Sequence, residues 1–211
     1  EIESLNEVES LFSQTVQEFQ ENGSFKRVLF KNIKEDKYLT LEEFFDALQI
    51  RAPENIYSAL EEDFNLFIYS QYQGNRPGIA AEVKDKGALE SMLLAEESSL
   101  KEDFQPFFSL ITEDRPPLVN YFRNANQLPG YVGHNFRYQT LATNDTGICY
   151  LVSDNYFVLT SSFASMEQTI EKLGIPGPTV ELTEDLEYGE RGYKVEVLKT
   201  WLAQDAATYH R

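Results

Sequence analysis

The sequence predicts an α+β fold with a mostly antiparallel sheet and helices packed chiefly on one face. Three observations predict it. Several segments repeat apolar residues at helix spacing, and others are short strand-like runs between tight turns. The order strand, tight turn, strand, capped helix also occurs twice, over residues 64–97 and 147–173. This repetition suggests two related halves that share one sheet.

The first elements are an amphipathic helix, a strand and a capped helix. Residues 1–21 form one apolar stripe that ends at Asn22–Gly23, either as a docked helix or as part of a coiled coil. A docked helix is favoured, because a coiled coil needs ~3–4 heptads. Residues 25–32 read as a strand. Thr40 and Glu43 have the spacing of a capping box, which opens a helix through residue 48.

The remainder of the first half alternates strands and helices. One strand is apolar on both faces, as expected at a central position. Gly74–Asn75 then makes a turn, and Asp85 can cap the helix after the next strand. The expected elements are a helix over 54–62, strands over 64–72 and 77–84, and helices over 86–97 and 100–111, the last interrupted at Pro106.

The second half repeats this order and ends at a linker. Strands are expected over 119–123, 134–141, 147–152 and 156–161, and Ser162 or Ser165 caps a helix through 173. The segment Gly174–Pro178 holds two Pro and two Gly, which interrupt helices and strands. The predicted organisation is a main domain over 1–173, a linker over 174–182 and a partial module over 183–211.

The charge balance excludes some classes of partner. Asp and Glu number 35 against 18 Lys and Arg, for a net charge of −17, so nucleic-acid binding is not expected. No apolar run reaches the ~18–20 residues that a membrane span needs. The chain begins at Glu1, which suggests a longer protein and leaves open a signal peptide or membrane anchor upstream.

The chain carries no strong catalytic, cofactor or metal motif, and no residue is assigned to any of these roles. His134 has no evident partner, Cys149 lies in an apolar run, and Ser161–Ser162 opens a helix. We interpret them as a structural histidine, a buried inert thiol and helix-capping serines.

Acidic and tyrosine side chains form two further sets of candidates. The acidic runs are Glu42–Glu43, Glu61–Asp63, Glu96–Glu97 and Glu184–Asp185. They are interpreted as solvated surface, with weak cation binding as the alternative. The tyrosines that could line a sugar- or peptide-binding surface are Tyr69, Tyr72, Tyr131, Tyr138 and Tyr156. Their β-propensity explains their place in strands equally well.

The last segment carries a family resemblance. Its spacing is Leu-x-x-Gly-x-x-Gly-x-x-Val-x-x-Leu-x-x-x-Leu, and it resembles the opening of a peptidoglycan-binding domain of the three-helix type. The matching residues are Leu186, Gly189, Gly192, Val195, Leu198 and Leu202. Lys199 departs from the usual Gln of the family, and the resemblance covers only residues from about 183 onward. The main domain resembles uncharacterised bacterial surface domains that lie between a membrane anchor and such wall-binding modules. These families carry no assigned catalytic residues.

The resemblance implies an extracytoplasmic setting in a bacterial cell envelope. The leading hypothesis is a non-catalytic spacer or interaction module whose partner is cell-wall glycan or another envelope protein, with no cofactor. The membrane would be reached only through an upstream anchor. One alternative is a wall-polymer hydrolase that uses acidic residues. The other is a subunit of a surface filament or assembly in which the N-terminal helix packs on a neighbour.

Overall fold

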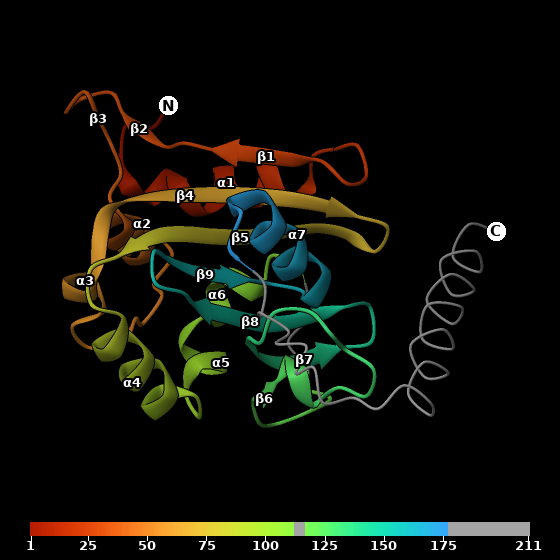
Figure 1. Cartoon of the computed structure of the whole chain (residues 1–211). Coiled ribbons are helices and arrows are strands. Elements are labelled where there is room, and N and C mark those ends of the chain that lie inside the picture. The colour runs from red at the N-terminus through yellow and green to blue at the C-terminus, as the bar shows by residue number, and fades with distance from the viewer. Residues whose placement is uncertain (112–116, 177–211) are drawn as a thin grey trace, which may run out of the picture. The chain divides into compact units, whose positions relative to one another are not determined.

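The computed structural model describes residues 1–111 and 117–176. The chain divides into two compact units, Glu1–Pro178 and Thr179–Arg211, and the described residues all lie in the first. They form a seven-stranded antiparallel sheet with helices (Figure 1), so the predicted α+β class is confirmed. No described helix has the length and apolar character required to cross a membrane.

The sheet has the strand order β1-β4-β5-β9-β8-β7-β6, and each neighbouring pair is antiparallel. β5 and β9 join two hairpins, β4–β5 and β8–β9, at the centre of the sheet. The strands are β1 (Phe25–Val28), β4 (Leu60–Gln71), β5 (Gly74–Val83), β6 (Arg123–Asn124), β7 (Arg137–Ala142), β8 (Thr146–Val152) and β9 (Tyr156–Thr160).

Most of the helices cover one face of this sheet, which we call the helical face. Leu66, Ile79 and Leu159 point from the strands into the core there, and the predicted packing chiefly on one face is confirmed. The helices with buried residues in this core are α1 (Val8–Gln17), α2 (Leu41–Ala47), α3 (Ile56–Ala59), α4 (Lys86–Glu96), α5 (Leu100–Asp103) and α6 (Gln105–Phe108). The 3-10 turn Leu5–Glu7 leads into α1. The helix expected over 100–111 is interrupted at Phe104, between α5 and α6, and Pro106 lies in the first turn of α6.

The amphipathic N-terminal stripe packs within its own domain. Val8, Phe12 and Val16 are buried on α1, and the Phe12 ring meets Phe44 of α2 edge-on at 5.5 Å between centroids. Edge-to-face contacts of this kind stabilise an aromatic core beyond the area they bury. Most of the stripe therefore packs inside this chain, as expected of a docked helix, whereas Phe19 beyond the end of α1 is 98% exposed.

α7 (Phe163–Leu173) covers the opposite face, which we call the α7 face. Met166 and Ile170 of α7 pack there against Phe67, Val158 and Cys149. The repeated order of hairpin and helix is present as β4–β5–α4 and β8–β9–α7. However, α4 packs on the helical face and α7 on the other, in front of the sheet in Figure 1. The two halves share an order of elements but place their helices differently.

Three expected elements differ at their ends. The strand expected over 25–32 divides into β1 and β2 (Lys31–Asn32), and β2 pairs with β3 (Lys37–Tyr38) in a separate two-stranded sheet. The helix expected over 54–62 is only α3, because its last part begins β4. The strand expected over 119–123 is reduced to β6, followed by the 3-10 turn Ala125–Gln127.

Candidate functional site

β4 and β5 separate near one end of the sheet because β4 contains extra residues. Leu60 pairs with Val83 and Phe64 pairs with Ala81, so three residues of β4 face a single residue of β5. The three residues are Glu61–Asp63, and all of them are exposed. Such a bulge redirects side chains and interrupts pairing, and bulges are enriched beside binding sites.

An open cavity of about 790 Å³ lies at this bulge, and we call it the bulge cavity. Its volume falls within the ~300–1,000 Å³ typical of ligand sites. Its lining includes Leu173, at the C-terminal end of α7, and Tyr38 of β3. Its lining comprises residues 27–30, 38–39, 61–65, 80–82, Lys84, Tyr156 and Leu173.

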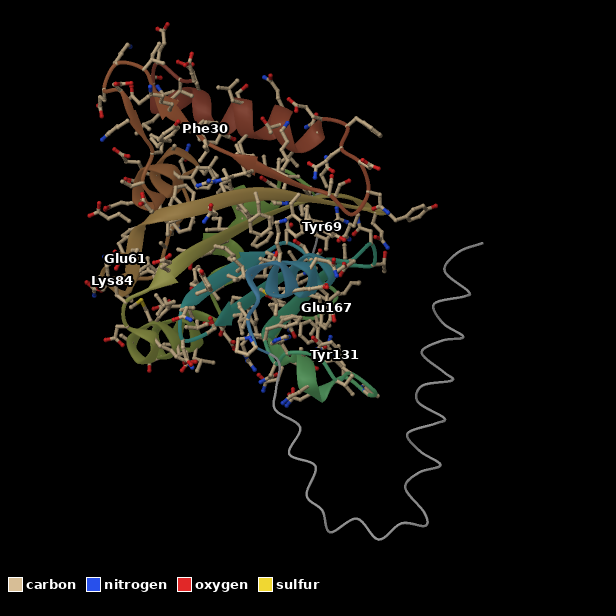
Figure 2. All side chains as sticks on the ribbon, turned by 45° about the horizontal axis from the view of Figure 1, so that its top comes forward. Phe30, Glu61, Tyr69, Lys84, Tyr131 and Glu167 are labelled. Atoms are coloured by element: carbon tan, nitrogen blue, oxygen red, sulfur yellow. The ribbon has the colours of Figure 1, made fainter. Side chains whose placement is uncertain are left out.

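The lining mixes acidic side chains with two cations. Glu61, Glu62, Asp63 and Glu82 line the cavity together with Arg27 and Lys84. Lys84 forms an ion pair with Glu61, with 3.2 Å between Nζ and Oε2, and Figure 2 shows these two side chains together at the edge of the sheet. The sequence interpretation of Glu61–Asp63 as solvated side chains agrees with their exposure, but it missed that they gather around a cavity.

A second, smaller cavity lies beside the bulge. Its volume is about 240 Å³, and it shares Glu61, Glu62 and Lys84 with the bulge cavity. Glu42 and Tyr57 complete its lining with Thr40 and Leu41. Burial, together with the negative charges of Asp46 and Glu42, raises the pKa of Tyr57 to about 12. The acidic surface therefore continues past the bulge toward α2.

His134 and Cys149 occupy structural positions away from the bulge cavity. His134 Nε2 lies 2.9 Å from the backbone oxygen of Ile175, an acceptor only, so this nitrogen donates. The residue precedes β7 instead of lying in it, contrary to the predicted strand over 134–141. Cys149 is 1% exposed in β8, and burial raises the pKa of its thiol well above the ordinary value. Neither geometry suits a nucleophile or a general base.

Ser161 and Ser162 are both fully buried and hydrogen-bonded within the fold. Ser161 Oγ donates to the backbone oxygen of Pro77 at 2.9 Å. Ser162 Oγ accepts from the backbone N–H of Ser165, which caps α7 as predicted, and donates to Gln71. The serine hydroxyls therefore hold the start of α7.

The five candidate tyrosines do not form one surface. Tyr69 and Tyr138 are buried in the sheet, whereas Tyr72 is 93% exposed at the β4–β5 turn. Tyr131 packs on Phe163 of α7, and its hydroxyl donates to the backbone oxygen of His134 at 3.1 Å. Only Tyr156 lines the bulge cavity. A broad aromatic platform is therefore not present among the described residues.

A raised carboxyl pKa occurs at Glu167, near Tyr131 and far from the bulge (Figure 2). Burial raises the pKa of Glu167, and the neighbouring Tyr131 hydroxyl lowers it in part. Glu167 nevertheless remains exposed to solvent, and its partner Tyr131 belongs to the segment that packs on α7. We read the pair as a link between that segment and α7.

Two buried polar networks were not found from the sequence. Arg137 donates from Nε and Nη2 to the two carboxylate oxygens of Glu97 at 2.6 Å each, and the Tyr150 hydroxyl donates to the same group at 2.7 Å. Asp145, at the β7–β8 turn, accepts from the backbone N–H groups of Phe163 and Ala164. Their partners are far apart along the chain, so no local motif marks them.

The wall-module-like motif lies outside the described residues, as do Glu184 and Asp185. Its members are Leu186, Gly189, Gly192, Val195, Leu198 and Leu202. Comparisons of the chain with protein-family models, curated proteins and solved structures found no match.

Proposed function

We propose that this chain is an interaction module of the bacterial cell envelope that binds a partner at the bulge cavity. It would also act as a spacer beside the wall-module-like segment. The observation that carries the proposal is the cavity itself, an open concave site where charged and apolar side chains meet at a break in strand pairing. Binding sites commonly combine these features.

The side chains most suited to covalent catalysis all have structural roles, which favours binding over catalysis. The thiol of Cys149 is buried, the imidazole of His134 is bonded to a backbone oxygen, and the hydroxyl of Ser162 caps a helix. Before any of them could take part in catalysis, its hydrogen bond would have to break or its side chain would have to become exposed. The bulge cavity does not include any of them.

The envelope setting rests on the resemblance of residues 183–211 to a peptidoglycan-binding domain. Under that reading, cell-wall glycan and another envelope protein are the two candidate partners. The acidic lining of the bulge cavity favours a protein with basic residues over an uncharged sugar chain.

A wall-polymer hydrolase is the second candidate, because four carboxyl groups line one cavity. Hydrolysis of a glycosidic bond needs one carboxyl in an environment that raises its pKa. Glu61, Glu62, Asp63 and Glu82 are all exposed, so their surroundings resemble solvent and favour binding. The direct assay is release of reducing ends from purified peptidoglycan. If the chain releases reducing ends and the variant Glu62→Gln/Asp63→Asn/Glu82→Gln does not, the chain is a hydrolase and the binding proposal is wrong.

Site-specific photo-crosslinking tests the binding proposal. A benzophenone amino acid replaces Tyr38 at the cavity or, as a control, Tyr121, which is 60% exposed and outside the cavity lining. In bacterial envelope extracts we expect an adduct of defined mass from position 38 and none from position 121. Asn65→Trp, a neutral change at an exposed lining residue, should block the adduct. Equal adducts from both positions, or adducts that survive Asn65→Trp, would overturn the proposal.

A further inference from the structure

The charges of the bulge cavity are unbalanced. Lys84 is already paired with Glu61, which leaves Arg27 as the remaining cation of the lining. Glu62, Asp63 and Glu82 form no ion pair with any residue in the described part of the chain. An exposed site with unpaired carboxylates attracts a cation, and the net charge of −17 would steer a basic ligand toward the molecule.

Apolar side chains border the same cavity. Leu29 is 49% exposed and Tyr38 is 58% exposed, and both line the cavity on the side of β1 and β3. Leu173 of α7 also lines the cavity. Within the described residues, no group of His, Cys, Asp and Glu side chains converges as a metal ion requires. The lining therefore suits an organic cation that also carries apolar groups.

An unpaired strand edge leads into the cavity. β1 is the outermost strand on its side of the sheet, so its far edge has no neighbouring strand among the described residues (Figure 1). Such an edge presents backbone N–H and C=O groups that can pair with an added strand. Arg27 and Val28, at the end of β1, are also part of the cavity lining. A chain laid along β1 would consequently continue into the cavity.

From this geometry we infer that the bulge cavity binds an extended, lysine- or arginine-bearing segment of a partner protein, which adds as a strand to the outer edge of β1. The inference rests on the proposed function and names the chemistry of the partner. Backbone pairing along β1 supplies affinity without regard to sequence, and the carboxylates of Glu62, Asp63 and Glu82 select basic side chains. Leu29 and Tyr38 contact the apolar side chains that alternate with them.

The test uses the full chain and a nine-residue fluorescent peptide of alternating lysine and valine. We expect saturable binding by fluorescence anisotropy that weakens as salt rises. Binding should weaken about tenfold or more in Glu62→Gln/Asp63→Asn/Glu82→Gln, because three charge contacts are lost. The matched control Glu9→Gln/Glu90→Gln/Glu102→Gln removes the same charge from exposed positions on helical segments and should bind like the unchanged chain.

Backbone pairing has its own measurement. Amide hydrogen exchange of residues 25–28 should slow when the peptide is bound, whereas exchange at the exposed turn around Tyr72 should not change. Spermidine, which carries positive charge without a peptide backbone, should not compete at equal concentration. Competition by spermidine as strong as by unlabelled peptide would overturn the inference of a polypeptide partner.

Three further outcomes would overturn the inference. They are equal affinity for a peptide with glutamate in place of lysine, equal weakening by the two triple variants, and no binding of the lysine peptide at all. The proposed function fails separately, through loss of the Tyr38 crosslink. A specific crosslink without lysine-peptide binding rejects only the basic partner, whereas absence of both rejects the cavity as a binding site.

Discussion

Arg76 lies near the start of β5 and is only 2% exposed. Its guanidinium donates to the backbone oxygens of Asn144 at 2.7 Å and Asp145 at 3.3 Å, both in the β7–β8 turn. Burial lowers the pKa of Arg76, and the negative charge of Asp145 raises it in part. One buried side chain therefore connects two turns that are far apart in sequence, through a planar set of donors that the single ammonium of lysine does not have.

The Cys149 thiol should react slowly in the native protein. Burial raises its pKa, so the reactive thiolate is scarce at neutral pH, and the side chain is 1% exposed. Labelling with a chromogenic disulfide reagent should be at least about tenfold slower in buffer than in guanidinium chloride. Fast native labelling would contradict the buried position. Cys149→Ala should cost about 1 kcal/mol through lost packing and leave binding at the bulge cavity unchanged.

The Glu97–Arg137 pair should contribute measurably to stability. Their side chains are only 18% and 23% exposed, and the contact is bidentate. Glu97→Gln should lower the free energy of unfolding by about 1–3 kcal/mol, because Arg137 and Tyr150 lose a charged acceptor. Urea denaturation measures the change. Glu90→Gln on the same helix, at an exposed position, should change it by less than about 0.5 kcal/mol. Equal effects would show that the pair contributes nothing specific.

At the scale of elements, local signals predicted those parts of the fold that depend on neighbouring residues. Asp85 accepts from the backbone N–H of Ala88 to cap α4, and Ser162 caps α7 in the same way. The β4–β5 turn falls at Tyr72–Gln73, two residues before the expected turn at Gly74–Asn75, because these two residues already pair with β4. The α3 helix was predicted too long because Leu60 pairs with Val83 of β5, so that β4 begins where the helix was expected to continue. Pairing with distant strands is not encoded in local propensity.

The capping box of α2 is both predicted and present. Thr40 accepts from the backbone N–H of Glu43, and Glu43 accepts from the backbone N–H of Thr40. Thr40→Ala should destabilise the protein by about 0.5–2 kcal/mol. The comparison is Ser91→Ala at an exposed position inside α4, which should be near neutral. Thermal unfolding monitored by circular dichroism distinguishes the two, and an equal small effect would reject a stabilising cap.

The same box should make stability depend on pH. The hydrogen bond from Lys37, followed by that from the backbone of Thr40, lowers the pKa of Glu43 from its ordinary 4.5. Ionised Glu43 therefore adds stability above this ordinary value, and that contribution is lost as the pH falls through the lower pKa of the folded state. In Glu43→Gln the free energy of unfolding should decline less between about pH 5 and pH 2. An unchanged decline would show that other carboxyl groups dominate.

At the scale of the whole molecule, the sequence predicted the fold class but not the site. The acidic run Glu61–Asp63 was visible, yet its place beside Arg27, Tyr38 and Leu173 depends on the bulge and on α7 packing on the other face. These residues come from four separate segments, and no periodic pattern joins them. Only the folded sheet brings these residues together around the cavity.

The folded unit should extend past α7. Gly174 ends the helix in a left-handed conformation, and Ile175 packs in the core of the α7 face while its backbone oxygen accepts from His134. A chain that ends at Pro178 should unfold in urea at the same midpoint as the main transition of the full chain. A chain that ends at Leu173 should lose about 1–2 kcal/mol with the Ile175 contacts. Equal stability of both would place the boundary at the predicted residue 173.

β5 and β9 lie side by side at the centre of the sheet, but they belong to hairpins made at very different times during synthesis. Each hairpin can close within ~1–10 microseconds of its strands becoming free, whereas joining the two requires closure of a long loop. During synthesis, the edge of β5 that pairs with β9, which includes Ile79, Ala80 and Ala81, therefore stays unpaired until β9 leaves the ribosome. An unpaired apolar edge is a template for wrong pairing with other chains. The central seam that holds the finished sheet together is thus the place where the nascent protein depends most on chaperones or on rapid completion of its second half.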